Sequence, residues 1–153
     1  MSFDARIAEL GLELPPPPPP AGTYSPVVVI DGMAYVSGQG PITPEGRWLQ
    51  GRVGDEITEE EGTAAARQVG LTMLATIKAE LGSLDRVARI VKVLGMVNCS
   101  AGFKNQPKVI NGFSDLMVEV FGEQGRAARS AVGMGSLPGN IPVEVEAILK
   151  LAD

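Results

Sequence analysis

Two side chains near the end of the sequence, Arg129 and Glu144, have the chemistry to bind a small acid and to activate a water molecule. An arginine can hold a carboxylate through two parallel hydrogen bonds, and a glutamate can orient or deprotonate water. Each residue lies at the start of an apolar segment, and we expect the two segments to pair as a hairpin that brings Glu144 near Arg129. A structural Arg–Glu pair between strands fits the same pattern, so both interpretations stay open at this point.

Further polar residues stand near the ends of the expected elements, where functional sites tend to collect. These residues are Tyr24, Ser37, Gln39 and Asn111. Each of them could also be an ordinary cap or turn residue. Glu144 and Glu146 share one face of a strand, as an acid/base pair would, but alternating charge on an exposed strand is the commoner cause of that spacing.

The residue types that are missing narrow the chemistry further. The 153 residues include no histidine and a single cysteine, Cys99. This composition excludes Ser-His-Asp and Cys-His catalysis, histidine-containing metal sites, an internal disulfide and a thiolate metal cluster. We therefore expect no metal and no cofactor, an inert buried thiol at Cys99, and chemistry carried by carboxylates, arginine, hydroxyls, amides and water.

Charge and hydropathy limit the partners. There are 13 basic and 18 acidic residues, the net charge is −5, and the basic residues are dispersed. This balance disfavours binding to nucleic acid, which requires neutralisation of phosphates. No apolar stretch is long enough to span a membrane, and the N-terminus has no basic region followed by an apolar one. We therefore expect a cytoplasmic protein without a membrane partner.

The chain is expected to begin with an arm, residues 1–21. Apolar residues at helical spacing predict a short helix over residues 2–10, with Ser2 as its cap and Gly11 as its stop. The six prolines of residues 15–20 favour a stiff polyproline II segment. We expect this arm to lay the helix over the domain or over a neighbouring subunit. The alternative is that the prolines bind a partner that reads proline-rich segments.

Residues 22–153 are expected to form one domain. The pattern predicts strands at 24–30 and 33–37 joined by the turn Asp31-Gly32, a helix between Thr58 and Gly82, a strand at 87–98 covered on both faces, a helix from Pro107 to Gly122, and paired strands at 129–135 and 142–151. A strand-helix-strand passage requires a parallel crossover, whereas hairpins are antiparallel. The predicted fold class is therefore α+β, a mixed sheet with two helices packed on one face.

The other face of this sheet also needs cover. In the last strand Glu144, Glu146, Ile148 and Lys150 alternate with apolar residues and share that face. This set is too polar for a packed core and too mixed for an ordinary solvent face. We therefore expect an oligomer whose subunit interface contains a polar cavity.

Several stretches resemble the YjgF/RidA family, the reactive intermediate deaminases. The matching stretches are Tyr-Ser-Pro at 24–26, YVSGQGP at 35–41, GRVGDEIT at 51–58, LGSLDRVARIVKV at 81–93, ARSAVGMGSLP at 128–138 and VEVEAI at 143–148. The resemblance covers about residues 22–150. The N-terminal arm, together with longer segments at 99–106 and 122–127, is similar to a longer subgroup labelled endoribonuclease L-PSP-like. The resemblance implies the chorismate-mutase-like fold and a homotrimer with clefts between subunits.

The resemblance also implies site roles and a reaction. Arg129 matches the arginine that holds the substrate carboxylate, and Glu144 matches the glutamate that handles the attacking water. Tyr24, Ser37 and Asn111 match cleft residues that bind substrate. The implied activity is hydrolysis of an enamine or imine, such as 2-aminoacrylate or 2-iminopropanoate, to a 2-keto acid and ammonia.

Active members of the family often carry a cysteine two positions after the arginine, where this chain has Ala131. Because of this departure, two alternatives stay open: a different substrate, or a non-catalytic trimer that binds ligands or has a regulatory role. An endoribonuclease is a further alternative.

Overall fold

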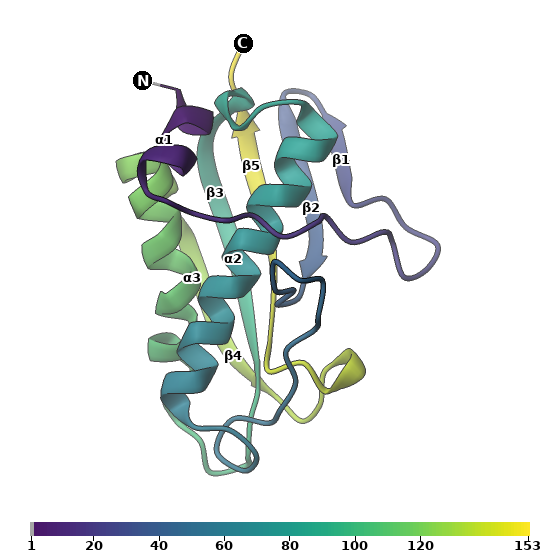
Figure 1. Cartoon of the computed structure of the whole chain (residues 1–153), viewed down its shortest axis with the longest axis vertical. Helices are drawn as coiled ribbons and strands as arrows, with labels where there is room; N and C mark the ends of the chain where they lie inside the picture. The colour runs from purple at the N-terminus through teal and green to yellow at the C-terminus, as the bar shows by residue number, and fades with distance from the viewer. Residues whose placement is uncertain (1) are drawn as a thin grey trace.

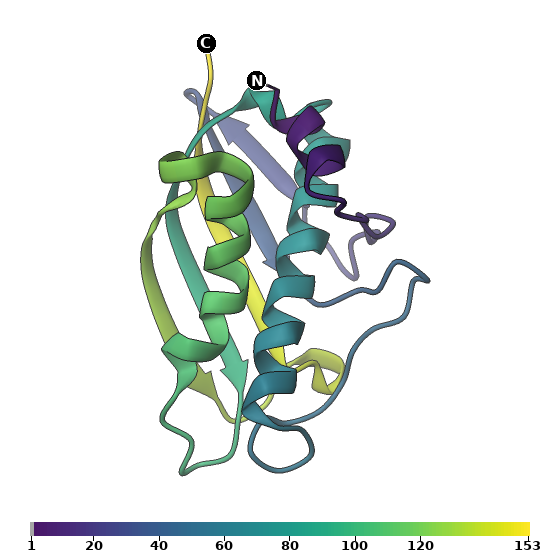
Figure 2. The same cartoon turned by 60° about the vertical axis from the view of Figure 1, so that its left-hand side comes forward.

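The computed structural model describes residues 2–153, which form one mixed five-stranded sheet covered by helices on one face (Figures 1 and 2). The elements are α1 (Phe3–Glu9), β1 (Val27–Ile30), β2 (Met33–Gln39), α2 (Glu59–Leu81), β3 (Val87–Asn98), α3 (Gln106–Phe121), β4 (Ala128–Met134) and β5 (Val143–Leu151), with short 3-10 turns η1 (Leu84–Arg86), η2 (Gly122–Gly125) and η3 (Pro138–Asn140). The expected α+β, chorismate-mutase-like class is confirmed. The strand at 24–30 is shorter than expected, since pairing begins at Val27.

The sequence signals for turns and caps are confirmed. Asp31 and Gly32 both have positive φ angles, 51° and 73°, which is the conformation of the two-residue hairpin that joins β1 to β2. The Thr58 side chain accepts a hydrogen bond from the Glu61 N–H at the start of α2. Gly82 ends that helix in the left-handed conformation, with φ 86°. These local devices set the lengths of the elements that surround the site.

The predicted pairing of the last two strands is wrong. The strand order is β1-β2-β5-β3-β4, so β4 and β5 are not neighbours. β4 pairs in parallel with β3, where Arg129 lies opposite Val93. β5 lies antiparallel to both β2 and β3. The chain between β4 and β5 is too long for a tight hairpin, and a central place lets β5 form hydrogen bonds along both of its edges.

Helices α2 and α3 pack side by side on the sheet (Figure 2). Their close approach depends on Gly112, where an added Cβ would run into the backbone carbonyl of Thr63 and lie 3.1 Å from the Arg67 nitrogen. The core between helices and sheet includes Phe113, Met73 and Leu149, which are fully buried.

The face of the sheet turned away from the helices is only partly covered. On β3, Val91 is 37% exposed and Lys92 is also exposed, so the expectation that this strand is covered on both faces is wrong for its first half. Next to Lys92, the cross-strand row continues through Ile148 to Tyr35, and the Tyr35 side chain is 43% exposed. The row ends at Val28, so Ile148, Tyr35 and Val28 form an apolar strip on this face of the described chain.

Helix α1 and the proline arm lie on the domain itself. The rings of Phe3 and Phe121 meet edge to face, with centroids 4.9 Å apart. Asp4 accepts hydrogen bonds from the Ser83 hydroxyl, at 2.5 Å, and from the Leu84 N–H, at 3.2 Å. From this anchor the arm runs across α2 toward β1 (Figure 1). The arm therefore leads from the C-terminal end of α3, where Phe3 packs on Phe121, to the residues that precede β1.

Candidate functional site

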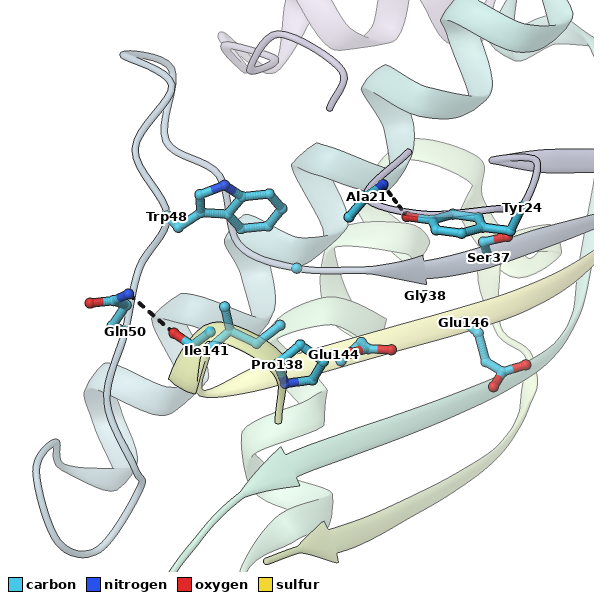
Figure 3. Close-up of a pocket in the computed structure, with 12 residues that line it drawn as sticks. Ala21, Tyr24, Ser37, Gly38, Trp48, Gln50, Pro138, Ile141, Glu144 and Glu146 are labelled. Atoms are coloured by element: carbon cyan, nitrogen blue, oxygen red, sulfur yellow. Dashed lines mark hydrogen bonds between the residues drawn. The ribbon is translucent and has the colours of Figure 1, made fainter. Parts of the chain in front are cut away.

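A cleft of about 720 Å³ lies where β2 ends and β5 begins (Figure 3). Its walls come from the end of the arm, the two strands, the loop after β2 and the turn before β5. The lining residues are Ala21, Tyr24, Ser37, Gly38, Gly40, Trp48, Gln50, Pro138, Gly139, Ile141, Glu144 and Glu146. Three residues predicted from the sequence, Tyr24, Ser37 and Glu144, are therefore brought together in one cleft.

A β-bulge shapes the floor of the cleft. Val36 pairs with Ala147 and Gln39 with Val145, so two residues of β2 lie opposite one residue of β5. Bulges of this kind redirect side chains and are common beside active sites. Gln39 holds the bulge from the helix side: its side-chain N–H donates to the Ser37 carbonyl at 2.9 Å, and the Thr76 hydroxyl donates to its Oε1 at 2.8 Å. Gln39 is thus a structural residue of the cleft and does not line it.

Ser37 and Tyr24 hold the start of the first hairpin to the end of the arm. The Ser37 hydroxyl donates to the Ser25 carbonyl at 2.6 Å. The Ala21 N–H donates to the Tyr24 hydroxyl oxygen at 3.2 Å. Tyr24 is 49% exposed, so the ring remains open toward the cleft.

Glu144 is the partly buried acid of the cleft. Burial, and then the neighbouring carboxylate of Glu146, raise the pKa of the Glu144 carboxyl above the usual value for glutamate. Both effects disfavour the charged form. Within the described chain, the cleft lining includes no lysine or arginine. The cleft by itself is therefore an acidic site without a counter-ion.

Arg129 lies elsewhere in the same chain. Its Nη1 donates to Asn111 Oδ1 at 2.8 Å and to Ser114 Oγ at 3.2 Å, so Asn111 and Ser114 of α3 hold the guanidinium. Arg129 forms no ion pair with any acid of residues 2–153. Asn111 and Arg129 line a hollow at the β4 edge, so the structure brings these two predicted residues together, but apart from Glu144.

The expected proximity of Arg129 and Glu144 in one chain is wrong. β3 separates their strands, and the two side chains point to opposite faces of the sheet. Arg129 aligns with Val93 and Ala147 on the helix face, whereas Glu144 alternates with the buried Val143 and Val145 and faces the other way. The short-hairpin assumption produced the error, because it placed β5 beside β4.

Sequence reasoning missed several residues of the site. Trp48, Gln50 and the turn residues before β5 come from segments without periodicity, so no local pattern marks them. Ser114 lies three positions after Asn111 on α3, and this helical spacing is the one signal that could have linked it to Arg129. Ala131, at the position of the family's cysteine, packs against the core. Among residues 2–153 no group of three or more His, Cys, Asp or Glu side chains is arranged to hold a metal ion.

Known proteins match nearly the whole chain. The family model described as "YjgF/chorismate_mutase-like, putative endoribonuclease" matches residues 4–147. Protein TCP17 of Trypanosoma cruzi is 43% identical over 148 residues, which cover 96% of this chain and 92% of that protein.

Two solved structures are also similar. One, described as a "putative endoribonuclease" from Shewanella oneidensis MR-1, is 33% identical, with a TM-score of 0.93 and coverage of 99% of this chain and 100% of that one. The other, RidA from the Antarctic bacterium Psychrobacter sp. PAMC 21119, is 29% identical, with a TM-score of 0.62 and coverage of 88% and 93%.

The fold and the matches over nearly the whole chain define a protein with the chorismate-mutase-like architecture. The chain belongs to the YjgF/RidA family. Over residues 2–153, no helix combines the length and the apolar character that crossing a membrane requires.

Proposed function

We propose that this protein hydrolyses small reactive enamines and imines of the 2-aminoacrylate and 2-iminopropanoate type to a 2-keto acid and ammonia. The observation that carries the proposal is Glu144, a partly buried carboxyl group in the cleft. Burial and the nearby Glu146 raise the pKa of this carboxyl group. A carboxyl group whose pKa moves toward neutrality exchanges protons more readily near neutral pH. Neither a metal nor a cofactor is needed for this chemistry.

An enamine first takes a proton from solvent at its β-carbon and so becomes the protonated imine, which then reacts in two steps. Water adds to the electrophilic carbon of the protonated C=N bond, and Glu144 accepts a proton from that water. Glu144 then returns this proton to the nitrogen of the carbinolamine, the C–N bond breaks, and the C=O bond forms as the hydroxyl proton passes to the leaving ammonia. From the protonated imine, one water is consumed and one ammonium released, without oxidation or reduction. Ser37 and Tyr24 contribute hydroxyl groups that position the substrate in the cleft.

The substrate carboxylate requires a cation, which we assign to Arg129 of a neighbouring subunit in a homotrimer. Two observations support this assignment. The cleft holds two carboxylates and no basic residue of the described chain, and Arg129 is held by neutral partners and has no acidic one among residues 2–153. Asn111 acts here through Arg129 by accepting its Nη1–H. The apolar strip with the exposed Tyr35 would supply the buried contact between subunits.

The alternative is a trimer that binds small carboxylates without turning them over. The same cleft could serve catalysis or binding alone. The alanine at position 131, where active family members often have a cysteine, favours binding without turnover. Cleavage of RNA is opposed by the net charge of −5 and by the two carboxylates of the cleft, which repel phosphates. The single cysteine is compatible with the proposed cytoplasmic location.

A direct test generates 2-aminoacrylate in situ with a dehydratase and follows its decay. We expect the wild-type protein to accelerate decay, and Arg129→Ala and Glu144→Gln to reduce kcat/KM by about a hundredfold or more. Arg89→Ala removes an arginine of β3 whose side chain donates hydrogen bonds to Gln124 and to the Arg126 carbonyl, and serves as the matched control. Decay at the rate seen without protein would contradict the proposal. Saturable, Arg129-dependent binding of pyruvate without turnover would establish the alternative.

A further inference from the structure

The cleft has two chemically different ends (Figure 3). Tyr24, Ser37 and Glu146 lie at one end, and Trp48, Ile141 and Gln50 lie at the other, with Pro138 beside Glu144 between them. A three-carbon imino acid uses only the polar end. The cleft of one chain, before a neighbouring subunit contributes Arg129, measures about 720 Å³, within the range of about 300–1,000 Å³ that is typical of sites for much larger ligands. The proposed reaction therefore leaves the apolar end unexplained.

Gly40 brings the two largest apolar side chains of that end together. A Cβ added at Gly40 would lie 2.7 Å from Trp48 Cζ3 and 2.9 Å from Ile141 Cδ1. The indole and the isoleucine side chain thus converge over the same backbone atom. Gly40 itself is buried, whereas Trp48 is 47% exposed. The indole therefore packs at Gly40 and leaves apolar surface open to the cleft.

Side-chain hydrogen bonds from the buried Asn98 and from Gln50 of the cleft lining hold the turn before β5, which carries Pro138 and Ile141. Asn98, which is 1% exposed, donates through Nδ2 to the Ile141 carbonyl at 3.1 Å and to Asn140 Oδ1 at 3.0 Å. The Gln50 side-chain N–H donates to the Gly139 carbonyl at 3.1 Å. A binding surface that is fixed before the ligand arrives loses less conformational entropy on binding. These contacts therefore favour a built site over a chance hollow.

We propose that Trp48, Ile141 and Pro138 form a side-chain subsite for imino acids with a bulky apolar group. The carboxylate and the C=N group lie at the Ser37 and Glu144 end, and a branched or aromatic side chain lies against the indole. This inference rests on the proposed function, because it assigns the apolar end by reference to the reacting end. The preferred substrates are then the imines of large apolar amino acids, and the three-carbon imine is a poorer substrate.

A binding experiment tests the subsite without relying on turnover. Trp48 is the only tryptophan of the chain, so its fluorescence reports on this end of the cleft alone. Wild-type protein is titrated with 4-methyl-2-oxopentanoate and with pyruvate, which share the keto acid group and differ in the side chain. We expect a saturable change in Trp48 emission and a Kd at least about tenfold lower for the branched acid. Trp48→Phe, which removes the signal, serves as the optical control.

A selectivity experiment tests the same residues during catalysis. Imines are generated in situ from leucine and from alanine with an amino-acid oxidase, and the ratio of their kcat/KM values is measured. We expect Trp48→Ala and Ile141→Ala to lower the leucine-to-alanine ratio by about tenfold, and Trp48→Phe to restore most of it. Val29→Ala truncates an exposed apolar residue outside the cleft and should keep the wild-type ratio. Circular dichroism confirms that each variant is folded.

The outcomes separate this inference from the proposed function. Equal affinities for the two keto acids, or a ratio that Trp48→Ala leaves unchanged, would overturn the subsite while the deaminase proposal stands. If neither acid binds and neither imine is hydrolysed faster than in buffer, the proposed function fails and the subsite fails with it. Tighter binding of the branched acid without turnover would support the subsite in a binding protein.

Discussion

Gly38 lies directly against the carboxyl group of Glu144. A Cβ added to Gly38 would lie 3.0 Å from Glu144 Cδ, and closer still to Oε2. Gly38 does not have a positive φ angle, so its backbone conformation is open to alanine. A glycine at position 38 therefore leaves room for the Glu144 carboxyl group, and the conformation of the strand does not require it.

Gly38→Ala should reduce activity while leaving the fold stable. The new methyl group displaces the flexible end of Glu144 and not the backbone, so the cost in stability is small. A catalytic carboxylate moved by about 1 Å loses about a hundredfold in rate. The measurements are kcat/KM with in situ 2-aminoacrylate and thermal unfolding. Gly102→Ala, at a position with no atom within 4 Å of the added Cβ, is the control, and equal activities of the two variants would contradict the prediction.

Glu146→Gln should move the acidic limb of the pH–rate profile to lower pH. The negative charge of Glu146 is the second cause, after burial, of the raised pKa of Glu144. Removing it lowers the pKa of Glu144, so the catalytic carboxylate stays ionised into more acidic solution. Measuring kcat/KM from about pH 5 to pH 9 locates the limb. Superimposable profiles of variant and wild type would show that Glu144 is not the titrating base.

Glu144→Gln should make the protein more stable at neutral pH. Because the pKa of Glu144 is raised in the folded state, the folded chain binds this proton more tightly than the unfolded chain does. The charge of Glu144 therefore opposes folding once the pH exceeds the unfolded value of about 4.3. The gain from glutamine should be largest near neutrality and disappear as the pH falls below that value. Urea unfolding at a series of pH values checks this, and a gain independent of pH would contradict it.

Mixing two inactive variants should restore activity if the site is shared between subunits. Arg129→Ala lacks the cation and Glu144→Gln lacks the acid. In mixed trimers formed after co-refolding at equal amounts, about a quarter of the interfaces combine an intact Arg129 with an intact Glu144 from the next subunit. We expect about that fraction of wild-type activity. Activity no higher than that of either variant alone would mean that no such shared site exists.

Gly112→Ala should destabilise the protein through the helix pair. The added Cβ meets the Thr63 carbonyl and the Arg67 nitrogen of α2, and backbone atoms cannot rotate away as a side chain can. We expect a loss in the upper part of the range of about 1–3 kcal/mol that overpacking costs. Urea unfolding measures it, again with Gly102→Ala as control. A loss no larger than in the control would show that α2 and α3 separate without cost.

Local sequence signals determined most of the elements correctly. The Asp31-Gly32 turn, the Thr58 cap and the Gly82 stop act within a few residues of themselves, so short-range hydrogen bonds and backbone preferences suffice to predict them. The absence of histidine excludes whole classes of mechanism on composition alone. The family motifs then indicate Arg129 and Glu144 as the residues to locate.

The tertiary structure alone decided how those residues are arranged. Nothing local to β5 shows that it enters the sheet between β2 and β3, because a strand of alternating apolar residues fits several neighbours equally well and the choice is made by hydrogen bonding along both edges. That choice separated Arg129 from Glu144 and set Glu144 against Gly38. It also made an apolar wall of Trp48 and Ile141, which lie far apart in the chain and which no pattern in the sequence connects. The sequence thus determined the chemistry available, and long-range packing decided which groups share a cleft.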